Sequence, residues 1–109
     1  MARTTVEFVP KRDRATVEQA VRGVLADDGY REIDYNLERV WKMGTGLMTA
    51  MHYIKVEYEP DKVRVSGWVQ IGVGSVGGKE RDLTGVVGAV PKKSVRKTME
   101  KIRAVVEQA

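Results

Sequence analysis

The sequence contains no cysteine, a single histidine and no long apolar run. Without cysteine the protein has no disulfide, no thiolate nucleophile and no cysteine ligands for zinc or an iron–sulfur cluster. A small domain without disulfides is typical of a reducing compartment, so we expect a cytoplasmic protein. No apolar stretch approaches the roughly 18 residues of a membrane span, and the first residues lack the apolar core of a signal peptide. We therefore expect a soluble protein.

What the sequence does contain is typical of one globular domain that covers residues 1–109. A chain of 109 residues leaves room for one hydrophobic core, and 42% hydrophobic with 31% charged residues is neither a disordered nor a fibrous composition. The formal net charge is +4.

The net charge is concentrated at the C-terminal end, from Pro91 to Ala109. The basic residues there are Lys92, Lys93, Arg96, Lys97, Lys101 and Arg103. Only Glu100 and Glu107 oppose them, so this segment carries +4 and the first ninety residues are balanced. Such a segment can bind an anion, a nucleic acid, an anionic membrane or an acidic partner, although a solvated basic helix face is the simpler interpretation.

Periodicity and turn residues predict eight elements. They are a strand at Thr4–Val9, a helix ending at Asp27–Gly29, a hairpin of Tyr30–Tyr35 with Glu38–Met43, a hairpin of His52–Glu59 with Lys62–Ile71, a sixth strand within Arg81–Ala89, and a helix from Pro91 to about Gln108. Asp13 and Thr16 can each cap the first helix, and Thr16 with Gln19 fits a capping box. Gly29 suits the left-handed position after that helix.

Charge pairs predict the register of both hairpins. In the second hairpin, a turn at Pro60-Asp61 places Glu57 opposite Arg64 and Tyr53 opposite Trp68. In the first hairpin, a two-residue turn at Asn36-Leu37 places Asp34 opposite Arg39 and Ile33 opposite Val40. That turn requires positive φ at Leu37, which is costly, so a longer turn is the alternative.

The element order β-α-β-β-β-β-β-α predicts an α+β fold, in which an antiparallel sheet of about five to six strands packs against two helices as a two-layer sandwich. This order resembles the helix-grip and TATA-binding-protein-like folds, in which a curved sheet wraps a long C-terminal helix. The resemblance is one of topology and implies no functional residues.

One motif has a resemblance of its own. The run from Trp41 to Met51, Trp-Lys-Met-Gly-Thr-Gly-Leu-Met-Thr-Ala-Met, is followed by Tyr53-Ile-Lys55, Gly67-Trp68 and Val90-Pro-Lys-Lys93. Together these segments resemble a small bacterial domain of unknown function, sometimes joined to zinc-ribbon segments. The resemblance covers about Gly29 to the C-terminus and implies no activity, and this chain has no zinc ribbon.

No pattern in the sequence favours catalysis, a cofactor or a metal. Gly72 to Gly77 reads G-x-G-x-x-G, but no good helix follows it and the sheet is antiparallel, so a loop is expected rather than a dinucleotide site. His52 has no carboxylate partners at metal-ligand spacing and is expected at the rim of the core. We expect no catalytic residue, no cofactor and no metal site, and hence a protein that is not an enzyme.

Large aromatic and methionine side chains are predicted to share the sheet face that the helices leave open. On the second hairpin they lie on the face of Glu57 and Arg64, and on the first hairpin on the face of Asp34 and Arg39. They are Met51, Tyr53 and Trp68 from the second hairpin, and Tyr30, Trp41 and Met43 from the first. An exposed patch of this kind is typical of an interface. The alternative is that sheet curvature, loops or the N-terminal segment cover it.

These patterns favour a non-enzymatic interaction module, a homo-oligomer (a dimer first) that associates through the aromatic face. One alternative is a small apolar ligand bound between the curved sheet and the C-terminal helix. Another is nucleic-acid or anionic-surface binding through the basic helix. We expect only weak nucleic-acid affinity, because Glu100 and Glu107 can pair with Arg96 and Arg103.

Overall fold

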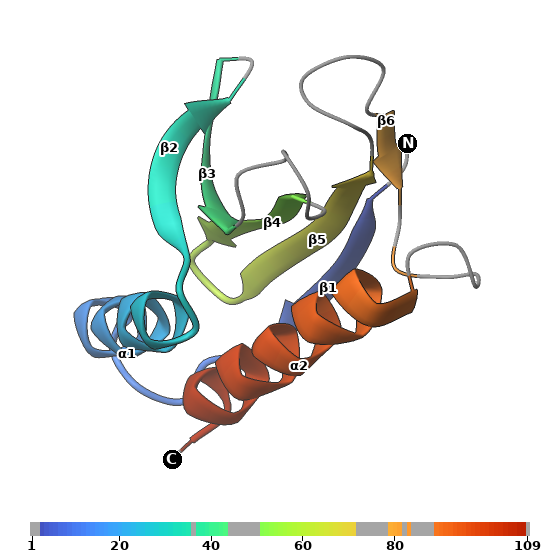
Figure 1. The fold of residues 1–109 in the computed structure, drawn as a ribbon. Coiled ribbons are helices and arrows are strands. Elements are labelled where there is room, and N and C mark those ends of the chain that lie inside the picture. Colours follow the sequence, from blue (N-terminus) through green and yellow to red (C-terminus); the bar gives the residue numbers. More distant parts are fainter. Residues whose placement is uncertain are drawn as a thin grey trace.

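In the part of the chain that the structure describes, the protein forms one sheet and two helices (Figure 1). This computed structural model describes residues 3–35, 37–43, 51–71, 79–81, 83 and 89–108. The elements are β1 (Thr4–Phe8), α1 (Arg14–Asp27), β2 (Arg31–Tyr35), β3 (Glu38–Met43), β4 (Met51–Tyr58), β5 (Val63–Ile71), β6 (Lys79–Arg81) and α2 (Ala89–Val106). The predicted α+β class and element order are confirmed.

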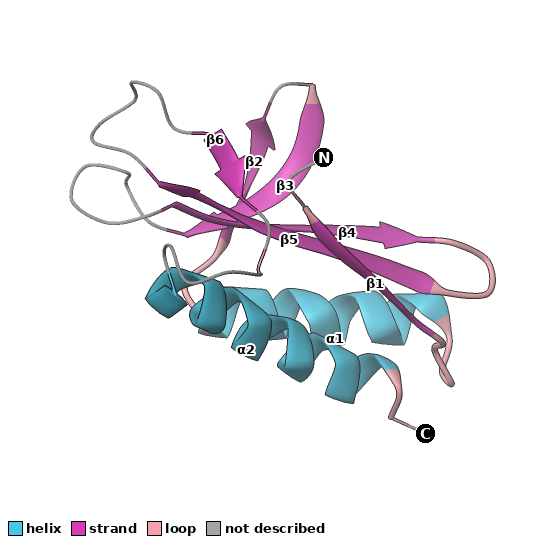
Figure 2. Cartoon of the chain, turned by 90° about the vertical axis from the view of Figure 1, so that its right-hand side faces the viewer, coloured by secondary structure: helices cyan, strands magenta, loops and turns pink. Residues whose placement is uncertain are grey.

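The sheet is antiparallel, with the strand order β1-β5-β4-β3-β2, and β6 pairs with the far end of β5. Both helices lie side by side on one face of the sheet (Figure 2). Strands β2, β3 and β6 rise away from the helices, so the helix-free face is on the inside of the bend (Figures 1 and 2). The arrangement is therefore a two-layer one in which a single side of the sheet is covered by helices.

The ends of α1 are set by its flanking polar residues. Asp13 is the N-cap, since its carboxylate accepts hydrogen bonds from the backbone N–H (3.1 Å) and the hydroxyl (2.7 Å) of Thr16. Thr16 lies in the first turn of the helix, so the alternative of a capping box from Thr16 to Gln19 is wrong. At the other end Gly29 adopts φ 91°, the left-handed conformation that was expected of it.

Both hairpins have the predicted register. Glu57 pairs with Arg64 and Tyr53 with Trp68 in β4–β5, while Ile33 pairs with Val40 in β2–β3. The first hairpin turns with Leu37 at φ 68°. A left-handed leucine costs about 1–2 kcal/mol, and the cross-strand pairs of β2 and β3 offset that cost.

Two boundaries near the C-terminus differ from the prediction. Strand β6 spans Lys79–Arg81, so it shares only Arg81 with the predicted range and lies earlier. Its position follows from backbone pairing with Val69–Ile71 of β5 rather than from its own apolar pattern. Helix α2 begins at Ala89, which places Pro91 inside the first turn, where no intrahelical N–H bond is lost. The predicted loop Gly72–Gly78 and residues 84–88 lie outside the described residues.

The main core lies between the sheet and the two helices. The stripes of both helices are buried in it, namely Val17, Val21 and Leu25 from α1 with Val95, Met99, Ile102 and Val106 from α2. Helix α2 approaches β5 most closely at Gly67, where a Cβ atom would lie 2.6 Å from Met99 Sδ and 2.9 Å from Val95 Cγ1. Glycine at this position lets the helix pack directly against the strand.

Candidate functional site: an apolar groove at an open sheet edge

The predicted aromatic face exists in part, but its aromatic rings are buried. Trp68 is fully buried, Tyr53 is 2% exposed and Met51 packs beside them on the helix-free face. Val40, Ile33 and Tyr35 complete this small second core. Two of the three large side chains expected from the second hairpin are thus enclosed by the chain itself, and the covering alternative is the one observed for them.

The three side chains expected from the first hairpin lie on the opposite face. Tyr30 belongs to the main core, and Trp41 and Met43 pack against it on the helix side. The reversal follows from the β3–β4 pairing, which puts Trp41 opposite Ile54, a residue of the helix-side core. Opposed residues of paired strands share a face, so Trp41 must face the helices. The prediction that all six residues share one face is therefore wrong.

Arg3, the residue that precedes β1, covers part of the second core. Its guanidinium lies 3.7 Å from the centroid of the Trp68 ring, which in turn stacks on Tyr53 at 5.3 Å. The same guanidinium donates two hydrogen bonds to Glu38, at 2.9 and 3.0 Å, and Lys55 Nζ donates to Glu38 at 2.7 Å. These bonds from Arg3, and then from Lys55, lower the pKa of Glu38 to about 2. The cluster is closed by satisfied charges, so it offers stability rather than an open binding surface.

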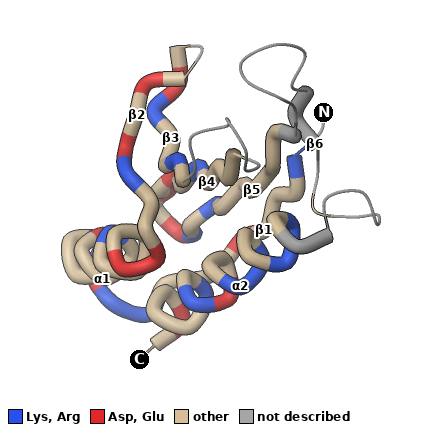
Figure 3. Tube along the Cα trace, viewed as in Figure 1, with Lys and Arg blue, Asp and Glu red and all other residues tan. Residues whose placement is uncertain are grey.

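The basic residues predicted as an anion-binding set spread over different sides of α2 (Figure 3). Lys92 is buried, whereas Lys93 and Lys97 are exposed. Lys101 bonds Asp28 at 2.8 Å, and this bond, with one from Thr98, lowers the pKa of the Asp28 carboxyl. The set therefore forms no single anion site.

Two further basic residues of α2 face β1. Arg103 pairs with Glu107 at 3.1 Å, the pair expected from the sequence, and also approaches Glu100 at 3.8 Å. The expected pair of Arg96 with Glu100 is not formed, because Arg96 donates to the backbone carbonyl of Leu83 instead. Among the described residues no carboxylate pairs with the exposed Arg96.

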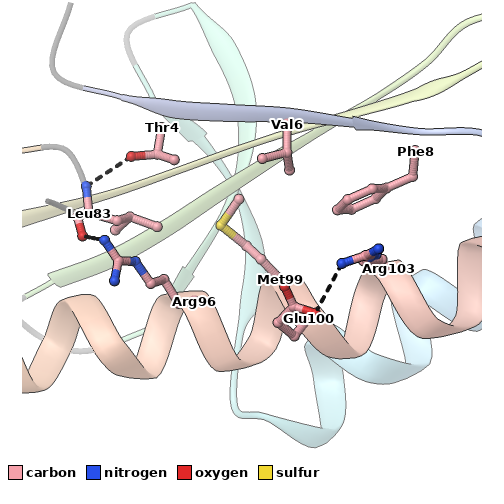
Figure 4. Close-up of a pocket in the computed structure, with 8 residues that line it drawn as sticks. All are labelled: Thr4, Val6, Phe8, Leu83, Arg96, Met99, Glu100 and Arg103. Atoms are coloured by element: carbon pink, nitrogen blue, oxygen red, sulfur yellow. Dashed lines mark hydrogen bonds and ion pairs between the residues drawn. The ribbon is translucent and has the colours of Figure 1, made fainter.

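An apolar groove separates β1 from α2 (Figure 4). Its volume is about 310 Å³. Its walls are Val6 and Phe8 from β1 and Met99 from α2, with Thr4 and Leu83 at one end. Its rim on α2 carries Arg96, Glu100 and Arg103. The groove thus has an apolar floor and a charged border, which is a common design for sites that hold apolar side chains.

One wall of this groove is an open edge of the sheet. In the part of the chain that the structure describes, β1 pairs with β5 on one side and with no strand on the other. Every second residue of such an edge strand directs its N–H and C=O away from the sheet. Leu83 N–H donates a hydrogen bond to the Thr4 hydroxyl at 3.0 Å, so the groove ends at this contact between Leu83 and Thr4. Backbone hydrogen-bonding groups therefore line an apolar hollow along most of β1.

The described residues hold no cluster of three or more histidine, aspartate or glutamate side chains with metal-binding geometry. His52 is half-buried on β4, opposite Met43 and Val69. No helix in the described ranges has both the length and the apolar character to cross a membrane.

The groove was not predicted from the sequence. Val6 and Phe8 lie within the strand predicted at Thr4–Val9, and Met99 lies within the helix predicted from Pro91 to about Gln108. Nothing in either pattern indicates that β1 lies at an edge. The alternative of an apolar cavity beside the C-terminal helix was the nearest expectation.

Comparisons with protein-family models, curated proteins and solved structures found no match for this chain.

Proposed function

We propose that the protein is a non-enzymatic interaction module that binds an extended segment of another protein along β1. The single observation that carries this proposal is the apolar groove between β1 and α2, one wall of which is an unpaired strand edge among the described residues. Strand addition of this kind combines backbone hydrogen bonds with pockets for alternate side chains. Both components are present side by side at this site.

An extended peptide uses more of the site than a small apolar ligand would. A small ligand would fill the hollow at Val6, Phe8 and Met99 but would leave the outer N–H and C=O groups of β1 to water. β1 has five residues, about 17 Å of edge at the usual rise per residue. A bound strand would pair with that edge and direct every second side chain into the groove.

The groove favours a different protein over a second copy of this chain. If two copies paired their β1 strands antiparallel about Val6, the Glu100 side chains would approach each other across the two-fold axis. Like charges that face each other at an interface oppose association. A homodimer through this edge is therefore an outcome that the test must distinguish.

The test begins with a library of random twelve-residue peptides displayed on phage and selected on the full chain. Recovered peptides are synthesised and titrated into ¹⁵N-labelled protein. We expect them to shift the amide signals of β1 and of the α2 residues that line the groove. Val6→Lys should weaken binding by about tenfold or more, because it places a charge in the apolar contact. Thr5→Lys is the matched control, since Thr5 is exposed on the opposite face of the same strand.

Methylation of alternate peptide nitrogens distinguishes a peptide that pairs with β1 as a strand from one that binds only through its side chains. One of the two alternating series should lose binding if the peptide pairs with β1, because its N–H groups then form the ladder. Equal binding by both series would show that the groove takes side chains without strand addition. Equal binding to the Val6→Lys and Thr5→Lys variants would contradict the proposal. Light scattering on the protein alone detects a homodimer.

A further inference from the structure

The groove has a direction, which follows from the course of β1 and α2. Thr4, Leu83 and Arg96 lie at one end, Val6 and Met99 in the middle, and Phe8 and Arg103 at the other end (Figure 4). A strand added antiparallel to β1 would run from the Phe8 end to the Thr4 end. Its C-terminal part would then lie beside Arg96, and a parallel strand would lie the other way round.

The two ends of the groove differ in charge. At the Thr4 end, Arg96 has no carboxylate partner among the described residues, and the first turn of α2 contains no acidic residue. At the Phe8 end, Arg103 is balanced by Glu100 and Glu107. Among the described residues, the side-chain charge along the groove therefore falls from positive at Arg96 to net negative at Arg103 and its two glutamates.

We infer that the bound segment is acidic at its C-terminal end and runs antiparallel to β1, with that end beside Arg96. The inference rests on the proposed function, which supplies the strand addition. Antiparallel pairing is slightly more stable per residue than parallel pairing, and it places the C-terminal end of the added strand beside the positive charge of Arg96. The predicted partner is an extended stretch of alternating apolar residues followed by aspartate or glutamate.

The experiment uses peptides from the selection, synthesised in two charge arrangements. One version has two glutamates after the apolar residues, and the other has them before. The first should bind about two- to fivefold more tightly at low salt, the range of a solvent-exposed ion pair. Arg96→Gln should remove this difference. Lys93→Gln removes the same charge from the exposed side of α2, outside the groove, and should preserve the difference.

A nitroxide at the C-terminus of the peptide reports the direction independently of affinity. Antiparallel binding should broaden amide signals near Thr4 and Arg96, whereas broadening near Phe8 and Arg103 would overturn the inferred direction. Equal affinity of the two charge versions would overturn the acidic preference. In either case, the proposed function is still supported if the Val6→Lys variant loses binding. If no recovered peptide depends on Val6, the proposed function fails and this inference fails with it.

Discussion

Replacement of Gly67 by alanine tests the close approach of α2 to β5. The added Cβ would lie 2.6 Å from Met99 Sδ, 2.9 Å from Val95 Cγ1 and 3.3 Å from Leu83 Cδ1. The thioether of Met99 can move, but Val95 is fully buried and its branched side chain has little freedom. Overpacking of this kind costs about 1–3 kcal/mol, and alanine regains about 0.5–1 kcal/mol of backbone entropy. We expect a net loss of about 1–2 kcal/mol in the free energy of unfolding.

Urea denaturation followed by circular dichroism measures this loss. With an m value of about 1–2 kcal/mol/M, the midpoint should fall by about 1 M. Gly23→Ala is the matched control, because a Cβ there meets nothing within 4 Å and the position lies inside α1, where alanine is about 1 kcal/mol better than glycine. The two variants should therefore shift the midpoint in opposite directions.

A double-mutant cycle identifies the cause. Val95→Ala removes the Cγ1 atom that the new Cβ would meet, so Gly67→Ala should cost about 1 kcal/mol less in that background than in the wild type. If Gly67→Ala matches or exceeds the wild type in stability, the reasoning about close packing is refuted. An equal cost in both backgrounds would place the strain elsewhere.

Three other predictions concern the helix-free side and the first hairpin. Leu37→Gly should raise the free energy of unfolding by about 0.5–1 kcal/mol, because Leu37 has a left-handed backbone conformation and a fully exposed side chain. Thermal unfolding measures the change, and a lower melting temperature would contradict the prediction. Glu38 has a pKa lowered to about 2 by Arg3 and Lys55, so its stabilisation is complete above pH about 4.5 and is lost as the pH falls towards 2. Glu38→Gln should therefore flatten the dependence of stability on pH in that window, and an unchanged acid limb in urea titrations would contradict the assignment. Trp68→Glu should destabilise the protein by about 3 kcal/mol or more, because the ring is fully buried; a variant that stays as stable as the wild type but loses self-association would restore the aromatic-interface hypothesis.

Local patterns predicted most of the elements and both hairpin registers. The stripe of α1 repeats within a few turns, and the partners Glu57 and Arg64 are separated by a short turn, so the information needed is contained in neighbouring residues. The boundary of β6 was not predictable in this way, because that strand is defined by its bonds to β5. The helix cap was ambiguous for a related reason: Asp13 and Thr16 both have suitable side chains, and only the backbone conformation decides between them.

The face that each hairpin presents to the helices required tertiary information. Each hairpin has two faces with apolar residues, and the sequence separates them within a hairpin but does not connect one hairpin to the other. The pairing of Trp41 with Ile54 makes that connection and places Trp41 on the helix side. The prediction turned the wrong face of the first hairpin towards the helices. Three of the six proposed interface residues were therefore placed on the wrong side of the sheet.

The sequence by itself determined the fold class, the helices and the two hairpins, because these depend on interactions between near neighbours in the chain. Only the tertiary structure decided that β1 lies at the edge of the sheet and that α2 leaves a groove beside it. β1 pairs with a strand about sixty residues away, and the contact of Thr5 with Ser66 spans 61 positions. A short strand such as Thr4–Phe8 has the same alternation at an edge as in the centre of a sheet. Its exposed side is set by which other strands pair, and that is a property of the whole fold.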